Sequence, residues 1–182
     1  MHPMTVSNLQ SAFAGESQAH MRYLIFADKA IRDGFLNVGR MFRAIAFAEQ
    51  IHATGHFRIM RNEVGDAQTV AGGAFGLGPT ADNLALAIGG EGFEVAEMYP
   101  AYKAVAASQG EKAAERSFDW AWQAEKIHNA MYKAAKAAVE TGSDYDIGTV
   151  FICGNCGHTV EGEAPDVCPI CGAKKEKYVA FE

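Results

Sequence analysis

The segment Glu49-Gln-Ile-His52 places a carboxylate and an imidazole three residues apart within an apolar stretch of the chain. The same pattern returns in the second half of the sequence as Glu125-Lys-Ile-His128. Residues three apart on a helix project from the same face, so each Glu and its His point in one direction. Each pair also lies near the middle of its helical segment, which predicts a site inside a helical bundle.

Two further glutamates extend this repeat. Glu16 precedes Glu49 by 33 residues, and Glu91 precedes Glu125 by 34 residues. A Glu from each of two helices plus Glu-x-x-His from two others is the ligand set of di-iron carboxylate bundles. Several carboxylates buried together are costly unless cations neutralise them. Oxygen and imidazole ligands suit two iron or manganese ions with open coordination positions, whereas a structural zinc site prefers thiolates.

Glu94 breaks the symmetry of the two halves, because the matching position in the first half is Ala19. Four carboxylates balance two ferrous ions to zero charge and leave two ferric ions with an excess of two positive charges. A fifth carboxylate lowers both totals by one, so it favours the oxidised pair. We therefore expect Glu94 to be an oxidation-linked ligand that trades places with neutral His52.

Other polar residues near these positions have simpler expected roles. Glu97 is expected to be exposed or to contact a metal-binding residue without binding metal itself. His20 and His56 are expected to be packing or surface histidines. Tyr23 and Tyr99 either fill the core or hydrogen-bond the metal ligands, and the sequence leaves both readings open.

Apolar residues recur with helical spacing over most of the chain. Ser7 with Gln10 resembles a capping box, and Gly34 stands where a helix-terminating glycine belongs. A glycine-rich, aperiodic segment separates the second and third helices. The pattern predicts a mainly α fold, a four-helix bundle with one long crossover, with helices over residues 7–33, 37–64, 80–108 and 111–141 and the crossover over 65–79.

Cysteine is confined to the end of the chain, where Cys153, Cys156, Cys168 and Cys171 form two knuckles separated by 11 residues. So short a module needs a metal to fold, and four thiolates hold either zinc or a single iron. Attachment to a redox-capable bundle favours iron. We expect a bundle domain (1–142), a linker (143–149) and a metal-knuckle domain (150–182), in which His158 is a surface residue.

Composition limits the classes of partner. The chain of 182 residues has 22 acidic and 16 basic side chains and a net charge of −6, so it lacks the basic surface that nucleic acid binding requires. No apolar run approaches the length of a membrane span, and the first residues lack the features of a signal peptide. We therefore expect no nucleic acid partner, no membrane association and a cytoplasmic location.

At this point the sequence resembles the rubrerythrin family over essentially its whole length. The resemblance is carried by the two knuckles and by four segments: Phe13-Ala-Gly-Glu16-Ser-Gln-Ala, Glu49-Gln-Ile-His52, Gly90-Glu91-Gly-Phe-Glu94-Val-Ala-Glu97-Met-Tyr-Pro100 and Glu125-Lys-Ile-His128. It implies a ferritin-like di-iron bundle followed by a small rubredoxin-like domain with one cysteine-bound iron, for which zinc is the alternative.

The resemblance also implies residue roles and an activity. Glu49 and Glu125 would bridge two irons, Glu16 would bind the first, and Glu91 with His128 the second, while His52 and Glu94 alternate on the first. The implied activity is peroxidase: reduction of hydrogen peroxide to water with electrons relayed through the cysteine-bound iron. These electrons would come ultimately from a reduced pyridine nucleotide. Because the sequence has no nucleotide-binding fingerprint, an external reductase or rubredoxin would have to deliver them.

Chain length leads to an expectation about assembly. The predicted site lies about 24 Å from the end of the fourth helix, whereas an eight-residue flexible linker spans only about 15 Å. We therefore expect a head-to-tail homodimer or a higher oligomer, in which each cysteine module serves the partner's site.

Other functions stay open at this stage. The alternatives to a peroxidase are a ferroxidase or iron-storage protein, an oxygen-reducing di-iron protein, and a non-enzymatic binding module with zinc knuckles and a metal-free bundle.

Overall fold

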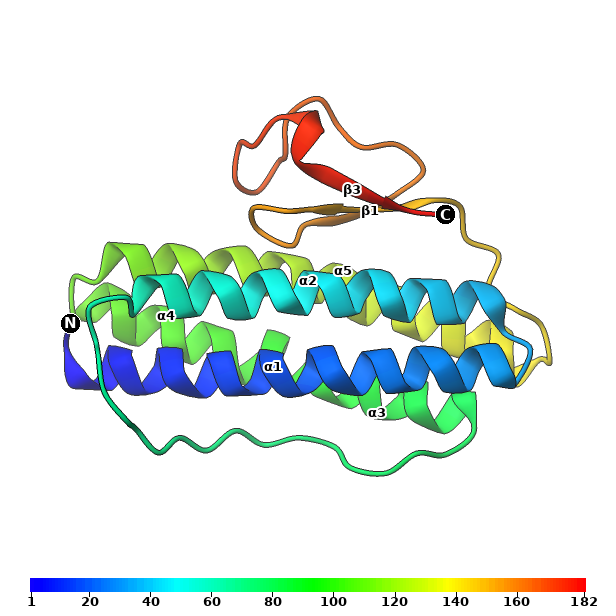
Figure 1. Ribbon diagram of the computed structural model, residues 1–182, viewed down its shortest axis with the longest axis horizontal. Helices are drawn as coiled ribbons and strands as arrows, with labels where there is room; N and C mark the ends of the chain where they lie inside the picture. The colour runs from blue at the N-terminus through cyan, green and yellow to red at the C-terminus, as the bar shows by residue number, and fades with distance from the viewer.

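The computed structural model describes all 182 residues and shows a helical bundle with a small β-sheet module on one side (Figure 1). Helices α1 (Pro3–Arg32) and α2 (Leu36–Ile59) form an antiparallel pair. Gly34 in the turn between them has a φ of 92°, which only glycine adopts without strain, so the predicted glycine stop is confirmed.

The predicted ends of this pair need two corrections. The capping box at Ser7 and Gln10 is wrong, because α1 already begins at Pro3, after His2 as N-cap. Proline suits the first turn of a helix, since its φ is preset and its missing N–H would have had no partner there. α2 ends at Ile59, five residues before the predicted end at residue 64.

The second pair of helices contains an interruption that the sequence pattern did not predict. The segment expected as one helix over 80–108 consists of α3 (Thr80–Phe93), a π-helical turn η1 (Glu94–Met98) and α4 (Tyr99–Ser108). In the π turn, the Tyr99 N–H donates to the carbonyl of Glu94, five residues back. Pro100 follows directly and has no N–H to continue the regular helical ladder. π turns are frequent at functional sites.

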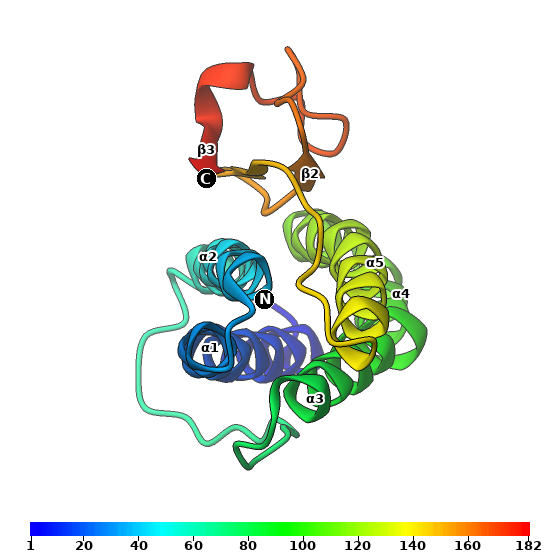
Figure 2. The same ribbon diagram turned by 90° about the vertical axis from the view of Figure 1, so that its right-hand side faces the viewer.

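Helix α5 (Lys112–Glu140) completes the bundle. Seen along its axis, α1 and α2 lie on one side, and α5 with α3 and α4 lies on the other (Figure 2). Two apolar clusters fill the interior. The larger includes Tyr23, Phe26, Phe42, Ile45 and Tyr132, and the smaller includes Leu9, Met98, Tyr99 and Phe118.

The crossover between α2 and α3 has no regular structure and runs along the outside of the bundle beside α1 (Figure 1). Side chains of α1 hold it by its carbonyl groups: Ser11 Oγ donates to Val70 O at 2.9 Å, and Arg22 Nε donates to Ala74 O at 2.9 Å. The predicted long crossover is therefore confirmed.

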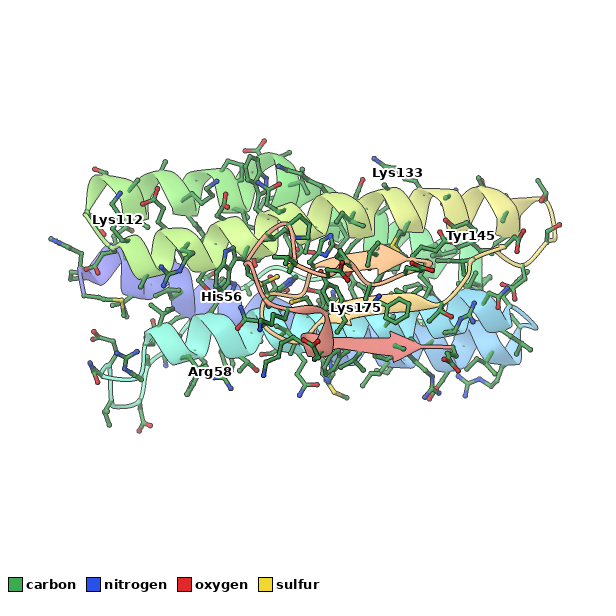
Figure 3. All side chains as sticks on the ribbon, turned by 90° about the horizontal axis from the view of Figure 1, so that it is seen from above. His56, Arg58, Lys112, Lys133, Tyr145 and Lys175 are labelled. Atoms are coloured by element: carbon green, nitrogen blue, oxygen red, sulfur yellow. The ribbon has the colours of Figure 1, made fainter.

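The cysteine module is a three-stranded antiparallel sheet in which β1 (Val150–Cys153) lies between β2 (Thr159–Glu161) and β3 (Tyr178–Phe181). A 3₁₀ turn, η2 (Lys175–Lys177), precedes β3. Figures 2 and 3 show the module over α2 and α5, midway along the bundle.

The module therefore packs on the bundle of its own chain, and the expected head-to-tail homodimer or higher oligomer stays a prediction. The reason for this packing lies in the connection. The Asp144 carboxylate accepts from the N–H groups of Asn37 (2.8 Å) and Val38 (3.2 Å), which anchors the linker at the start of α2. β1 then runs back along the bundle. The twelve residues 142–153 can span about 40 Å when extended, which exceeds the distance of about 24 Å from the end of the last helix back to the site. The length of the linker therefore does not by itself require a homodimer.

None of the helices is long and apolar enough to cross a membrane.

Candidate metal centres

Six buried side chains from four helices meet in the middle of the bundle, and we call them the carboxylate cluster. They form two overlapping groups whose potential ligand atoms lie within 4.8 Å of one another. Both groups contain Glu49 and Glu125, the first adds Glu16 and His52, and the second adds Glu91 and His128. This sharing is what two neighbouring ions with two bridging carboxylates require.

The two histidines direct their Nδ1 atoms at both shared carboxylates. His52 Nδ1 lies 3.0 Å from Glu49 Oε2 and 2.8 Å from Glu125 Oε1. His128 Nδ1 lies 3.2 Å from Glu49 Oε1 and 2.7 Å from Glu125 Oε2. Their rings are stacked with centroids 5.9 Å apart. The imidazoles therefore flank the carboxylate pair on the side that faces the cysteine module.

Two tyrosines fix the outer carboxylates. Tyr23 OH donates to Glu91 Oε1 at 2.7 Å, and Tyr99 OH donates to Glu16 Oε1. The question that the sequence left open is thus answered: both hydroxyls hydrogen-bond members of the cluster. Each bond occupies one carboxylate oxygen, and the second oxygen of Glu16 and of Glu91 has no hydrogen-bond partner.

The orphaned atoms and the charges of the cluster fit a pair of divalent ions. Glu49 Oε1 and Glu125 Oε1 are buried and also lack hydrogen-bond partners, because the nearby His52 and His128 Nδ1 atoms bond the Oε2 atoms of Glu49 and Glu125. Without a cation, burial raises the pKa of Glu16 and of Glu125 well above the ordinary value, and the neighbouring carboxylates raise it further. Burial also raises the pKa of Glu49, but the adjacent His128 and His52 imidazoles outweigh burial and hold that pKa low. Bound cations would let Glu16 and Glu125 ionise beside Glu49.

Glu94 lies at the edge of this arrangement. It is the first residue of the π turn, is half-buried, and belongs to neither ligand group. It lines a cavity of about 650 Å³ beneath the crossover, together with Arg22 and Tyr23. The structure thus has His52 in the cluster and Glu94 outside it. The expected exchange between these two side chains stays a prediction.

The four cysteines come together as the sequence predicts, with their sulfur atoms within 4.8 Å of one another. Cys153 and Cys171 sulfurs are 3.7 Å apart, and Cys156 and Cys168 sulfurs are 3.6 Å apart. The Cys156 thiol and nearby backbone N–H groups lower the pKa of Cys153 to about 5, so a thiolate is already favoured there. This donor set fits one tetrahedral metal ion.

The module contacts the carboxylate cluster directly through the segment after Cys156. His128 Nε2 lies 2.8 Å from Thr159 Oγ1, and that hydroxyl donates to Gly157 O at 3.1 Å. Because Thr159 uses its only proton on Gly157, it must accept from an Nε2–H of His128. The Nδ1 of a neutral His128 is therefore free to bind a metal.

Gly157 makes the second contact, and it gives a testable prediction. Gly157 and Gly172 occupy equivalent knuckle positions with φ of 79° and 74°. An added Cβ at Gly157 would lie 2.1 Å from His52 Nε2, whereas one at Gly172 would meet nothing within 4 Å. Gly172→Ala should cost about 1–2 kcal/mol of unfolding free energy through backbone strain, and Gly157→Ala clearly more. Urea unfolding followed by the visible absorption of the cysteine-bound iron measures both, and equal losses would refute the contact.

The structure contradicts one of the predictions made for the remaining polar residues and agrees with the others. The expectation of a surface His158 is wrong: it is 8% exposed, because the Tyr178 ring of β3 packs edge-on against it and Tyr178 OH lies 2.7 Å from its Nδ1. His20 is partly buried, with Nδ1 2.6 Å from Ala46 O. His56 is fully buried between Ser117 and Tyr99. Glu97 is exposed, as expected.

Comparison with known proteins agrees with this architecture. A family model described as rubrerythrin matches residues 7–136, and one described as rubrerythrin, rubredoxin-like domain matches residues 151–179. Rubrerythrin-2 of Clostridium acetobutylicum is 46% identical over 98% of this chain and 97% of its own length. The rubrerythrin of Nitratidesulfovibrio vulgaris is 35% identical over 96% of this chain and 92% of its own. The fully reduced, all-ferrous structure of nigerythrin superposes with a TM-score of 0.85 at 31% identity, covering 97% of this chain and 86% of that one.

Fold and site together define a ferritin-like bundle with a carboxylate–histidine metal centre and an appended rubredoxin-like domain. The match covers both parts of the chain, and the chain belongs to the rubrerythrin family. Its cofactors are a di-iron site in the bundle and a rubredoxin-like iron site in the module. It is a di-iron oxidoreductase of oxidative-stress defence, and the module provides for electron transfer with a redox partner.

Proposed function

We propose that this protein is a non-haem di-iron peroxidase. One hydrogen peroxide, two protons and two electrons would give two waters. The observation that carries the proposal is the position of the four-cysteine module, which lies directly on His52 and His128 of the carboxylate cluster. A one-electron centre in this position supports repeated reduction of the bundle site, and repeated reduction is what a peroxidase needs.

We assign the ligands by their places in the two groups. Glu49 and Glu125 are proposed as bridging ligands, Glu16 and His52 as ligands of one iron, and Glu91 and His128 as ligands of the other. When bound, the iron pair would supply the two electrons that cleave the O–O bond. Cys153, Cys156, Cys168 and Cys171 are proposed to hold the third iron.

The side chains of this chain have supporting tasks. Tyr23 and Tyr99 keep Glu91 and Glu16 oriented by hydrogen bonds. Thr159 fixes the ring of His128 with Nδ1 turned inward. Glu94 has room to move, because it borders the cavity under the crossover, and we propose that it replaces His52 when the site is oxidised. A reduced pyridine nucleotide, acting through an external reductase or rubredoxin, is proposed as the electron source.

Anaerobic stopped-flow oxidation of the fully reduced, iron-loaded protein tests the function. Substoichiometric hydrogen peroxide should oxidise the site quickly, with one peroxide consumed per two electrons, and dissolved oxygen should react much more slowly. The iron should stay bound throughout. Fast oxygen consumption with release of iron would instead support a ferroxidase or storage role, fast oxygen consumption with iron retained an oxygen-reducing enzyme, and inertness to both oxidants would refute the di-iron assignment.

A further inference from the structure

His56 is a buried polar residue that the ligand set does not use. Its side chain is one helical turn from His52 on α2, and its exposed fraction is 0%. Both ring nitrogens have partners: Nδ1 lies 2.9 Å from Ser117 Oγ on α5, and Nε2 lies 3.1 Å from Tyr99 OH on α4. Tyr99 in turn donates to Glu16 Oε1. Four side chains thus form one continuous hydrogen-bonded line.

The proton positions along this line follow from its inner end. A metal-binding Glu16 is ionised and can only accept, so the single proton of Tyr99 points to Glu16. The Tyr99 oxygen must then accept from His56, which places a proton on Nε2. Burial lowers the pKa of His56 to about 3, so the ring is neutral and its Nδ1 carries no proton. Nδ1 therefore accepts from Ser117, and every donor in the line points toward Glu16.

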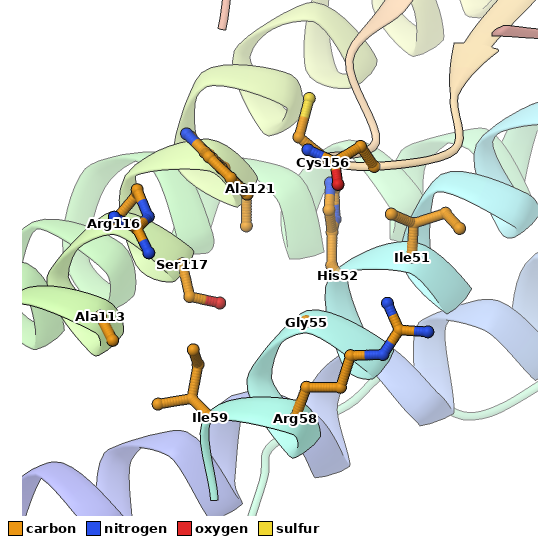
Figure 4. A pocket seen from close by; sticks show the side chains of 12 residues that line it. Ile51, His52, Gly55, Arg58, Ile59, Ala113, Arg116, Ser117, Ala121 and Cys156 are labelled. Atoms are coloured by element: carbon orange, nitrogen blue, oxygen red, sulfur yellow. The ribbon is translucent and has the colours of Figure 1, made fainter. Parts of the chain in front are cut away.

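The outer end of the line reaches a surface pocket. Ser117 is partly exposed and lines a cavity of about 180 Å³ between α2, α5 and the cysteine module. Figure 4 shows its side chain turned into this pocket, with Arg58 and Arg116 also on the lining. Gly55 leaves Ser117 Oγ uncovered on this side, because an added Cβ there would lie in contact with it at 3.5 Å. The pocket has room for water, which needs about 10–15 Å³ of such volume.

The proposed reaction needs this kind of connection. Each peroxide consumes two protons at a cluster whose carboxylates are at most 1% exposed. We propose that Ser117, His56 and Tyr99 form a proton relay that delivers protons from the outer pocket to Glu16, an inference that rests on the proposed peroxide reduction. In one transfer, a hydronium ion in the outer pocket gives a proton to Ser117 Oγ and becomes water, the original Ser117 proton passes to His56 Nδ1, the His56 Nε2 proton passes to Tyr99, and the original Tyr99 proton passes to Glu16. Each relay member ends neutral, and hydroxyl rotation with a return of the His56 tautomer resets the line.

Two variants of His56 separate proton transfer from packing. His56→Gln keeps an acceptor for Ser117 and a donor for Tyr99, but an amide does not pass a proton on. His56→Leu removes both bonds at similar volume. His20→Leu is the matched control, because His20 also lies in the bundle but forms its hydrogen bond to Ala46 O and not to a member of the relay. Removing a positioned proton donor typically slows a reaction by 10²–10⁴, so we expect both His56 variants to slow oxidation by peroxide at least about 10-fold and to increase its solvent isotope effect.

A second readout does not depend on activity. In zinc-substituted, ¹⁵N-histidine-labelled protein, NMR should show His56 as the Nε2–H tautomer, with the signal assigned by its loss in His56→Gln. The Nδ1–H tautomer would overturn the direction of the relay. Unchanged rates and isotope effects in His56→Gln would overturn the relay alone and point to proton entry through the cavity beside Glu94. If the unsubstituted protein itself fails to reduce peroxide, the proposed function fails and the relay falls with it.

Discussion

The Glu125→Gln variant is expected to lose both peroxide-reducing activity and binding of the iron pair. Glu125 belongs to both ligand groups, and its two oxygens lie 2.8 Å from His52 Nδ1 and 2.7 Å from His128 Nδ1. Glutamine has the same shape but removes one negative charge from the position shared by both ions. Loss even of a group that only supports a metal ligand costs about 10–100-fold in affinity, so we expect at least about 100-fold here.

The same substitution should have the opposite effect on the empty bundle. Burial raises the pKa of Glu125, with a further rise from Glu49 and Glu91, so the metal-free protein tends to protonate it. A neutral amide avoids the cost of ionising that group, and the metal-free variant should unfold at a temperature equal to or above that of the unsubstituted protein at pH 8.

Metal analysis and calorimetry measure the two effects of Glu125→Gln. Glu97→Gln is the matched control, since Glu97 is exposed on the π turn, and it should leave metal content and unfolding temperature unchanged. A Glu125→Gln protein that still binds two irons with normal affinity would contradict the bridging assignment.

The sequence predicted which side chains gather in the carboxylate cluster because their spacing is periodic. Glu49 with His52, and Glu125 with His128, repeat at helical intervals, and a helix converts such intervals directly into a shared face. The two cysteine knuckles are equally local, since each sits within four residues. Features of this kind need only secondary structure to be recognised.

Features that depend on contacts distant in sequence were not predicted. Asp144 caps α2 across more than a hundred residues, and this contact turns the linker back and places the cysteine module on its own bundle. The contact of His56 with Ser117 joins residues 61 apart, so the relay has no signal in local spacing. Pro100 was a visible signal for the π turn, but its effect on the helix was missed.

Stability of the metal-free bundle is expected to fall as the pH rises from 6.5 to 8, and bound divalent metal should reverse this trend. In the empty bundle, burial raises the pKa of Glu16 and Glu125 well above the ordinary value. Burial lowers that of His128, but Glu125, Glu49 and Glu91 together raise it above normal. The folded state therefore holds protons that the unfolded chain has already released, so each pH step upward favours unfolding.

Groups of the bundle with shifts in the other direction do not cancel this effect within that window, and Cys153, whose pKa is lowered to about 5, is kept from titrating by zinc in the module. The lowered pKa of Glu49 gives stability that is fully present above pH 4.5. His56 and His158 have lowered pKa values, so they cost stability only below about pH 6.5, where the unfolded chain takes up their protons. Each proton that the folded state holds and the unfolded chain has released lowers the free energy of unfolding by about 1.4 kcal/mol per pH unit, or roughly 3–6 °C in unfolding temperature.

Calorimetry at pH 6.5 and 8 measures this fall in stability. The sample is protein whose bundle contains no metal, while zinc in the cysteine module keeps the four thiolates bound. Glu125→Gln should reduce the fall, because it removes one of the protonating groups. With metal in the bundle the ligands must be deprotonated, so affinity and stability should both rise with pH. An empty bundle whose stability is flat or rises with pH would mean that its carboxylates ionise without metal, and the electrostatic reason for a cation pair would be lost.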